Sequence, residues 1–245
     1  MKEVRFTILE NSLIAANTWK MKLSGDTSAI VCSGEFVEIA IDGKFLRRPI
    51  SVHDVDWETL SLVYKVVGEG TAAMSRMLPG ESLNALTGLG TGFSIDESRS
   101  KFLLLGGGVG TAPLYQLAKE LCALQKEMTV VLGFNKESEV MLVEDFESLG
   151  AKVYVATMDG SAGTKGFVTD VVRLKNLTYD YFYACGPVPM LRAVCETVKG
   201  RGEVSLEERM GCGAGFCYCC SIQTAKGPRR VCKDGPVFKK EDLIW

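Results

Sequence analysis

The chain has 245 residues, 47% of them hydrophobic, and a formal net charge of −2. This length suits two domains, or two domains and a small module, with enough apolar side chains for real cores. The near-neutral charge gives no electrostatic case for binding nucleic acid or an anionic membrane, and no apolar run approaches the roughly 20 residues that span a bilayer.

Residues 1–96 contain short, often alternating segments rich in β-branched residues, such as VRFTILE, EFVEIAI and LSLVYKVV. This spacing predicts a small antiparallel β-barrel. One helix is expected after Gly70, over TAAMSRML, with Thr71 as its N-cap and Pro79-Gly80 as its stop. The only histidine, His53, lies here, and a Ser-His-Asp hydrolase would have to be built entirely around it, which argues against that class.

The stretch RRPIS, from Arg47 to Ser51, lies in the predicted barrel. An arginine can neutralise a phosphate with its bidentate fork, and Pro49 fixes the backbone beside it. Gly70-Thr71, before the expected helix, offers backbone donors for a second phosphate contact. An arginine pair beside a proline is also typical of a solvated edge, so these residues alone leave both interpretations open.

Residues 97–203 alternate apolar strands with helices, which predicts a parallel α/β sheet. The first strand runs into GGGVGTAP, a glycine-rich turn that allows backbone N–H groups to approach a pyrophosphate at a helix N-terminus. The same turn is also compatible with a plain tight turn. The positions assigned to nucleotide binding are Gly108, Gly110, Thr111 and Pro113.

Two further positions bear on the nucleotide. Asn135 and Lys136, rather than an acidic residue, follow the second strand, so the common NAD-dehydrogenase fingerprint is not met. Lys136 can pair with a 2′-phosphate, which leaves NADP open beside NAD. ACGPVPM follows the fourth strand, where open α/β sheets bind ligands, and Cys185 is therefore expected to face the nicotinamide, although it also suits a buried small residue.

Residues 204–245 carry a cysteine pattern, C-x4-C-x2-C-x11-C. Its first three positions match the loop of plant-type ferredoxins, whose thiolates hold a 2Fe–2S cluster. One C-x2-C pair and no later histidine argue against zinc, and scattered cysteines in a long chain argue against a disulfide framework. The segment is too small for a large core, so the cluster is expected to organise it. The predicted ligands are Cys212, Cys217, Cys220 and Cys232.

Cys219 stands beside the ligand Cys220 and is expected to be a small packed residue that points away from the cluster. Gly211, Gly213 and Gly215 supply the unusual dihedral angles that a loop around a cluster needs. Nine cysteines and no secretory segment favour a reducing cytoplasm.

With these residues in place, the chain resembles the ferredoxin-reductase superfamily from about residue 3 to residue 245. More closely, it resembles the family of electron-transfer subunits of NAD-dependent dihydroorotate dehydrogenase B. The cysteine segment is the most specific part. The matching segments are Arg48-Pro49-Ile50-Ser51, Val63-Tyr64-Lys65, Gly70-Thr71, Gly108 to Pro113, Cys185-Gly186-Pro187, and RMGCGAGFCYCC followed by RRVCKDGPVF.

The resemblance implies that the barrel holds FAD through Arg48 to Ser51, with the isoalloxazine on the strand Val63 to Lys65 and the pyrophosphate on Gly70 and Thr71. The α/β domain would take NAD, with Gly186 and Cys185 near the nicotinamide, and the four cysteines would hold the 2Fe–2S cluster. It also implies a separate FMN-containing catalytic subunit that oxidises dihydroorotate in pyrimidine biosynthesis, in a heterotetramer of two subunits of each kind.

Other functions stay open at this point. One is the flavin subunit of an NADH-dependent ferredoxin:NADP oxidoreductase or of a sulfide dehydrogenase. In that group the first ligand position tends to be aspartate, whereas this chain has Cys212. Another is a non-enzymatic redox sensor or a zinc-stabilised binding module. The chain departs from the family at Cys219, where alanine or glycine is usual, and within Thr87 to Phe93, where threonine replaces a frequent proline.

Overall fold

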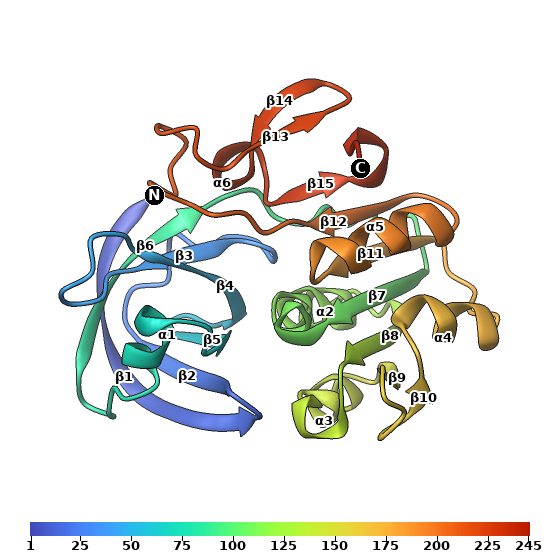
Figure 1. Ribbon diagram of the computed structural model, residues 1–245, viewed down its shortest axis with the longest axis horizontal. Helices are drawn as coiled ribbons and strands as arrows, with labels where there is room; N and C mark the ends of the chain where they lie inside the picture. Colours follow the sequence, from blue (N-terminus) through green and yellow to red (C-terminus); the bar gives the residue numbers. More distant parts are fainter.

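Residues 1–245 are described by a computed structural model, and their N-terminal part is a closed six-stranded β-barrel (Figure 1). Neighbouring strands are antiparallel in the order β1-β2-β5-β4-β3-β6. Alternating side chains of the first strand, Val4, Phe6 and Ile8, point into the barrel, which confirms the predicted alternation. The strands are β1 (Lys2–Ala15), β2 (Thr18–Ser24), β3 (Phe36–Ile39), β4 (Arg48–Val55), β5 (Thr59–Lys65) and β6 (Ser82–Leu89).

The helix expected after Gly70 exists, but its predicted ends were wrong. Helix α1 runs over Glu69–Met74 with Gly68 at the N-cap position. Thr71 lies inside the first turn, and its hydroxyl reaches back to accept the backbone N–H groups of Val67 at 3.0 Å and Gly68 at 3.3 Å. Thr71 therefore provides a hydrogen-bond acceptor for two backbone N–H groups at the start of the helix, and it does so from within the first turn rather than from the N-cap position.

The second domain is a seven-stranded sheet in the order β10-β9-β8-β7-β11-β12-β15. The chain moves outward from β7 to β10 and then returns to β11 beside β7. The strands are β7 (Lys101–Gly107), β8 (Glu127–Phe134), β9 (Lys152–Thr157), β10 (Thr164–Lys165), β11 (Tyr181–Cys185), β12 (Gly202–Ser205) and β15 (Val237–Lys239). The helices are α2 (Pro113–Ala123), α3 (Val143–Ser148), α4 (Val168–Leu174) and α5 (Val188–Thr197), with 3-10 turns η1 (Gly108–Thr111) and η2 (Glu137–Glu139).

Successive residues of the central strand β7 supply both faces of this sheet. Leu103 and Leu105 pack with residues of α4 and α5, whereas Phe102 and Leu104 pack with residues of α2 and α3. Because both faces are covered, the strand is a continuous apolar run rather than an alternating one. This is why KFLLLGG indicated a buried parallel strand.

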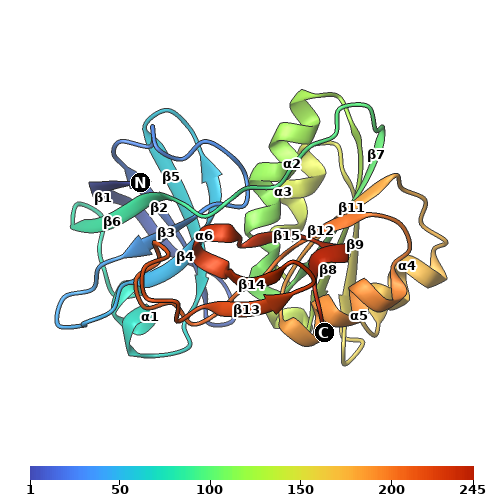
Figure 2. The same cartoon turned by 90° about the horizontal axis from the view of Figure 1, so that it is seen from above.

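The strands within residues 97–203 all pair in parallel, as predicted, and one further strand from outside this range joins the edge of the sheet. Strand β15 comes from the cysteine segment and pairs antiparallel with β12, with Glu203 opposite Lys239 and Ser205 opposite Val237. The same segment forms the hairpin of β13 (Ser221–Thr224) and β14 (Gly227–Arg230), helix α6 (Val231–Asp234) and η3 (Lys240–Asp242). Figures 1 and 2 show it lying across the junction of barrel and sheet. No helix has the length and apolar character needed to cross a membrane.

Hydrogen bonds fix the barrel domain against helix α2 of the sheet domain. His53 is fully buried, donates from Nδ1 to the carbonyl of Ala112 at 3.0 Å and stacks on Tyr115. Burial lowers the pKa of His53 to about 4, so the ring is neutral. The side chain of Glu120 accepts hydrogen bonds from the hydroxyl and the amide of Ser33. The only histidine is thus a structural contact between the two domains.

Candidate functional site

The glycine turn after β7 and the ACG segment after β11 meet at the carboxyl ends of neighbouring strands. The order of the sheet reverses between β7 and β11, and open α/β sheets bind ligands at such a reversal. Gly108 adopts φ of +54° and has open space where a Cβ would stand. Pro113 begins α2 directly after the turn. The structure therefore brings these predicted nucleotide-binding residues to one edge of the sheet.

Backbone meets backbone where this turn crosses the segment after β11. A Cβ at Gly110 would lie 2.6 Å from Cα and N of Gly186 and 2.7 Å from the carbonyl carbon of Cys185. Real Cβ atoms do not approach backbone that closely, so only glycine allows the crossing. Thr111 is completely buried beside it, with its hydroxyl unpartnered.

Cys185 ends strand β11 at this crossing and is half-buried. The pKa of the Cys185 thiol is raised to about 12, mainly by burial and to a smaller extent by the nearby carboxylate of Glu207. The side chain is therefore a neutral thiol rather than a thiolate nucleophile at neutral pH. A small neutral side chain suits a surface against which a planar ring packs.

Arg48 and Gly70 meet on the barrel. A Cβ at Gly70 would overlap the guanidinium of Arg48, so the glycine leaves room for the arginine to cross the start of α1. Arg48 also donates to the carbonyl of Leu46. The structure thus gathers a guanidinium and the backbone of the first turn of α1, a combination suited to phosphate oxygens. Pro49, Ile50 and Ser51 follow on the same strand β4.

The three residues of strand β5 that were predicted to support the flavin ring do not all face the same way. The Tyr64 ring lies in the barrel core and its hydroxyl donates to Asn11 at 2.9 Å, which leaves only its backbone for a ligand outside the barrel. Val63 instead packs with the apolar residues beneath α2 and α3. Lys65 pairs with Glu139 of the sheet domain at 3.5 Å. The strand therefore spans from the barrel core to the neighbouring domain.

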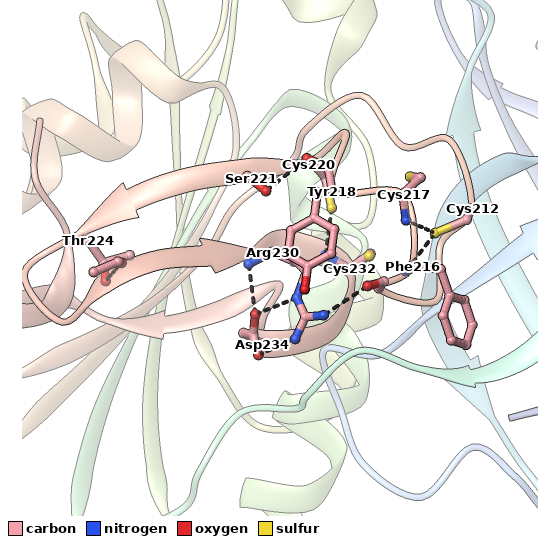
Figure 3. A network of polar contacts seen from close by, with 12 residues as sticks. Cys212, Phe216, Cys217, Tyr218, Cys220, Ser221, Thr224, Arg230, Cys232 and Asp234 are labelled. Carbon is pink, nitrogen blue, oxygen red and sulfur yellow. Dashed lines mark hydrogen bonds and ion pairs between the residues drawn. The ribbon is translucent and has the colours of Figure 1, made fainter.

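The four predicted cluster ligands lie as two pairs of thiols (Figure 3). The Cys212 sulfur accepts backbone N–H groups from Phe216 at 3.2 Å and Cys217 at 3.4 Å, and the Cys220 sulfur accepts the N–H of Cys232 at 3.4 Å. Burial alone would raise the pKa of Cys212, but the donated N–H groups outweigh it and lower the pKa to about 6. Hydrogen bonds from the loop backbone therefore favour the thiolate form of Cys212, the form that binds metal.

Burial separates the two pairs. Cys220 and Cys232 are each 2% exposed within an apolar cluster, and burial together with the neighbouring Cys220 thiol raises the pKa of Cys232 to about 12. Cys217 is exposed. No three of these side chains surround one point. Two pairs, each able to supply two sulfurs to one iron, fit a two-iron cluster better than a single ion.

Cys219 corrects an expectation. It does not pack inside the segment but lies exposed on the cluster loop beside buried Cys220. Four successive residues, Phe216 to Cys219, are exposed, and Tyr218 adopts φ of +58°, which turns the chain before it re-enters the core at Cys220. Cys219 therefore lies next to a predicted ligand in the chain but belongs to neither pair of thiols.

Glu38 lies beside the site, although the sequence EFVEIAI does not distinguish it from its other acidic residue, Glu35. Glu38 is 1% exposed, lies opposite Pro49 in the β3–β4 pairing, and its Oε1 has no hydrogen-bond partner. A Cβ at Gly213 would overlap its carboxyl group. Burial raises the pKa of Glu38 to about 7. The carboxyl group of Glu38 thus lies between strand β4, which is predicted to bind the flavin, and the cluster loop.

Replacing Glu38 by glutamine should change the pH dependence of stability. The folded carboxyl has a pKa above the ordinary 4.5, so the folded protein keeps a proton that the unfolded chain releases, and stability falls as pH rises through this window. Between about pH 5 and pH 8 the free energy of unfolding of the parent should fall relative to the variant, by up to about 3 kcal/mol. Urea unfolding at both pH values measures this. The exposed Glu58→Gln should leave the slope unchanged, and an equal slope in Glu38→Gln would contradict the assignment.

Two family models match the chain. The iron-sulfur cluster binding domain of dihydroorotate dehydrogenase B matches residues 207–244, and the oxidoreductase NAD-binding domain matches residues 104–196. The first covers all four paired cysteines, and the second covers the glycine turn and its crossing with Gly186. Both therefore coincide with the two regions that the geometry singles out.

Proteins with similar sequences match this chain over nearly its full length. The chain is 41% identical over 257 residues to the dihydroorotate dehydrogenase B (NAD(+)) electron transfer subunit of Fusobacterium nucleatum, with 99% of each chain covered, and 39% identical to that of Geobacillus sp. strain WCH70, with 100% and 99% covered. Among solved structures, an NADH-dependent reduced ferredoxin-NADP oxidoreductase shares 30% identity with a TM-score of 0.89, covering 98% of this chain and 90% of its own.

Proposed function

The chain belongs to the family of electron transfer subunits of dihydroorotate dehydrogenase B, and on that basis we propose that it carries electrons between a dihydroorotate-oxidising subunit and NAD. The observation that carries this proposal is the pairing of four thiols in a segment matched by the family's iron-sulfur domain. The same segment argues against a zinc-stabilised module. The sheet domain is an oxidoreductase NAD-binding domain, so the chain is an oxidoreductase subunit.

Three regions would hold the three redox groups. Arg48 to Ser51 with Gly70 and Thr71 would hold FAD on the barrel, with strand β5 beneath its ring. The crossing of Gly110 and Gly186, beside Cys185, would hold NAD. When bound, FAD accepts single electrons from the 2Fe–2S cluster and exchanges a hydride with NAD. The chain itself binds and orients these groups and keeps the thiol of Cys185 protonated.

The proposal requires a partner that binds the pyrimidine. The relatives that this chain matches over its full length are named electron transfer subunits, a name that implies a separate catalytic subunit. We infer an FMN-containing catalytic subunit that takes two electrons and two protons from dihydroorotate, in a cytoplasmic heterotetramer of two subunits of each kind. Of the pair Cys212 and Cys217, hereafter the outer pair, Cys217 is exposed and offers a surface at which electrons would cross to that subunit.

An NADH-dependent ferredoxin:NADP oxidoreductase subunit is the second candidate, since such a protein shares the fold over 98% of this chain. Two observations favour the first. The full-length relatives of the dihydroorotate family are more similar in sequence, at 41% against 30% identity. The cluster segment also matches the domain described for that family.

Mixing experiments test the function. The purified chain should oxidise NADH with an artificial acceptor but should leave dihydroorotate unchanged, because the proposal assigns oxidation of the pyrimidine to the catalytic partner. Addition of the FMN-containing catalytic subunit should produce dihydroorotate-dependent reduction of NAD, followed at the absorbance of NADH. Turnover of dihydroorotate by the single chain, or failure of the two subunits to form a complex, would sink the proposal. A transfer to NADP in the presence of ferredoxin would favour the second candidate.

Arg48→Ala should weaken FAD retention. The change removes a charged fork beside the first turn of α1, and such contacts are worth about 1.5–3 kcal/mol, or roughly ten- to hundredfold in affinity. Equilibrium titration of the flavin-free protein with FAD measures the loss. Arg76→Ala is the control, because Arg76 lies beyond the C-terminal end of α1 and its side chain makes no hydrogen bond to β4. Equal affinities in both variants would show that Arg48 is only a surface residue.

A further inference from the structure

Arg230, at the end of strand β14, has three partners from different parts of the cluster segment (Figure 3). Its Nη1 donates to the carbonyl of Gly215 at 2.8 Å. Its Nε and Nη2 donate to the two carboxylate oxygens of Asp234 at 3.1 and 3.4 Å. Its guanidinium carbon lies 5.0 Å from the centre of the Tyr218 ring. One planar group therefore joins the loop, the hairpin and helix α6.

Each of these partners is tied to predicted ligands. Gly215 lies between Cys212 and Cys217, and Tyr218 directly follows Cys217. Asp234 ends the four-residue helix α6, whose second residue is Cys232. The guanidinium thus connects the segment that carries the outer thiol pair with the helix that carries one thiol of the inner pair.

The outer pair depends on such a connection more than the inner pair does. Cys220 and Cys232 are fixed by burial in the apolar core, whereas Cys217 is exposed and its loop contributes no residue to that core. The loop does pack closely on α6, because a Cβ at Gly215 would lie 2.8 Å from Cβ of Lys233. This contact brings the Gly215 carbonyl within reach of Arg230, and the hydrogen bond then fixes the distance.

We propose that Arg230 is a positioning residue that fixes the outer thiol pair, Cys212 and Cys217, relative to the buried pair, Cys220 and Cys232. Its three contacts hold the gap into which the two irons must fit, so that the cluster assembles in one geometry and leaves slowly. Lysine cannot do the same, because its single nitrogen lacks the planar fork that reaches carbonyl and carboxylate together. This inference rests on the proposed function, which assigns a 2Fe–2S cluster to the four thiols.

Arg230→Gln and Arg229→Gln form a matched pair for the test. Both remove one positive charge from strand β14, but Arg229 is exposed and its side chain makes no hydrogen bond in the structure. The full chain is purified without oxygen, and the rate at which a chelator removes its iron is measured. We expect release to be about 10- to 100-fold faster in Arg230→Gln and unchanged in Arg229→Gln, as for outer-sphere partners of metal ligands. The electron paramagnetic resonance spectrum of the reduced protein should broaden only in Arg230→Gln.

Two further variants keep the test decisive if Arg230→Gln does not fold. Arg230→Lys keeps the charge but loses the fork, and it should release iron nearly as fast as the glutamine variant. Asp234→Asn loosens the same fork and should shift release in the same direction. Full restoration by lysine, or equal release rates in Arg230→Gln and Arg229→Gln, would overturn the positioning role. A parent protein that contains no iron and no acid-labile sulfide would instead overturn the cluster assignment, and with it the proposed function.

Discussion

Cys217→Ser should abolish the visible spectrum of the 2Fe–2S cluster and remove nearly all iron from the purified chain, while most of the FAD remains. Cys217 is exposed and donates its amide to the sulfur of half-buried Cys212, with which it forms the outer pair, so its loss would leave one iron with a single protein ligand. The barrel core shares no residue with the cysteine segment, so flavin binding should survive. Iron analysis and the absorbance ratio of flavin to cluster measure both effects.

Cys219→Ala is the matched control for this change. It also removes one exposed thiol from the same loop, but a thiol outside the two pairs. Iron content and spectrum should stay as in the parent. A Cys219→Ala variant without iron and cluster absorbance, together with a fully loaded Cys217→Ser variant, would exchange the roles of the two residues and overturn the ligand set.

Gly110→Ala should reduce NADH oxidation with an artificial acceptor by about 100-fold, the typical consequence of misplacing reacting groups by about 1 Å. The new Cβ would stand 2.6 Å from backbone atoms of Gly186, and neither backbone can move aside as a flexible side chain would. The glycine turn and the segment after β11 must therefore separate. Since both are assigned to the nucleotide, the loss should appear in kcat/KM for NADH, with flavin content unchanged.

Gly150→Ala separates this effect from general destabilisation. Gly150 belongs to the same domain, follows helix α3 and adopts φ of +78° with open space around it. Alanine there costs about 1–2 kcal/mol of backbone strain without touching the crossing. NADH oxidation should be close to that of the parent at temperatures where both variants are folded. If Gly110→Ala were as active as the parent, the crossing of Gly110 and Gly186 would not be part of the nucleotide site.

The elements that were predicted correctly from the sequence are determined by residues that lie close together in the chain. The apolar run KFLLLGG, the glycines after it and Pro113 at the first turn of α2 specify strand, turn and helix by local rules. The spacing of Cys212, Cys217 and Cys220 similarly reflects a single short loop. In both cases the residues that cooperate are neighbours in the chain, so the pattern is visible without the fold.

Features that depend on distant partners could not be predicted in this way. Strand β15 has only three residues and forms because the edge of β12 is open to it. Glu38 and Gly213 are far apart in sequence and meet only because the cluster segment lies over the barrel. Arg230 looks like one of two equivalent arginines until its contacts distinguish it from Arg229. Pairings of high sequence separation are set by tertiary packing, which overrides local preference.

The antiparallel edge strand also implies an order of events during synthesis. The amide of Thr91 donates to the carbonyl of Gly235 at 2.6 Å, and the amide of Leu206 donates to that of Pro236 at 2.9 Å, so the segment just before β15 bonds both to the end of the barrel and to the residue after β12. These partners emerge from the ribosome before the segment that joins them, and domains fold largely in that order. The two larger domains would thus dock first, and iron would enter a protein whose flavin and nucleotide regions already face each other. Cells starved of iron should accordingly accumulate a flavin-containing, NADH-oxidising form rather than an unfolded chain.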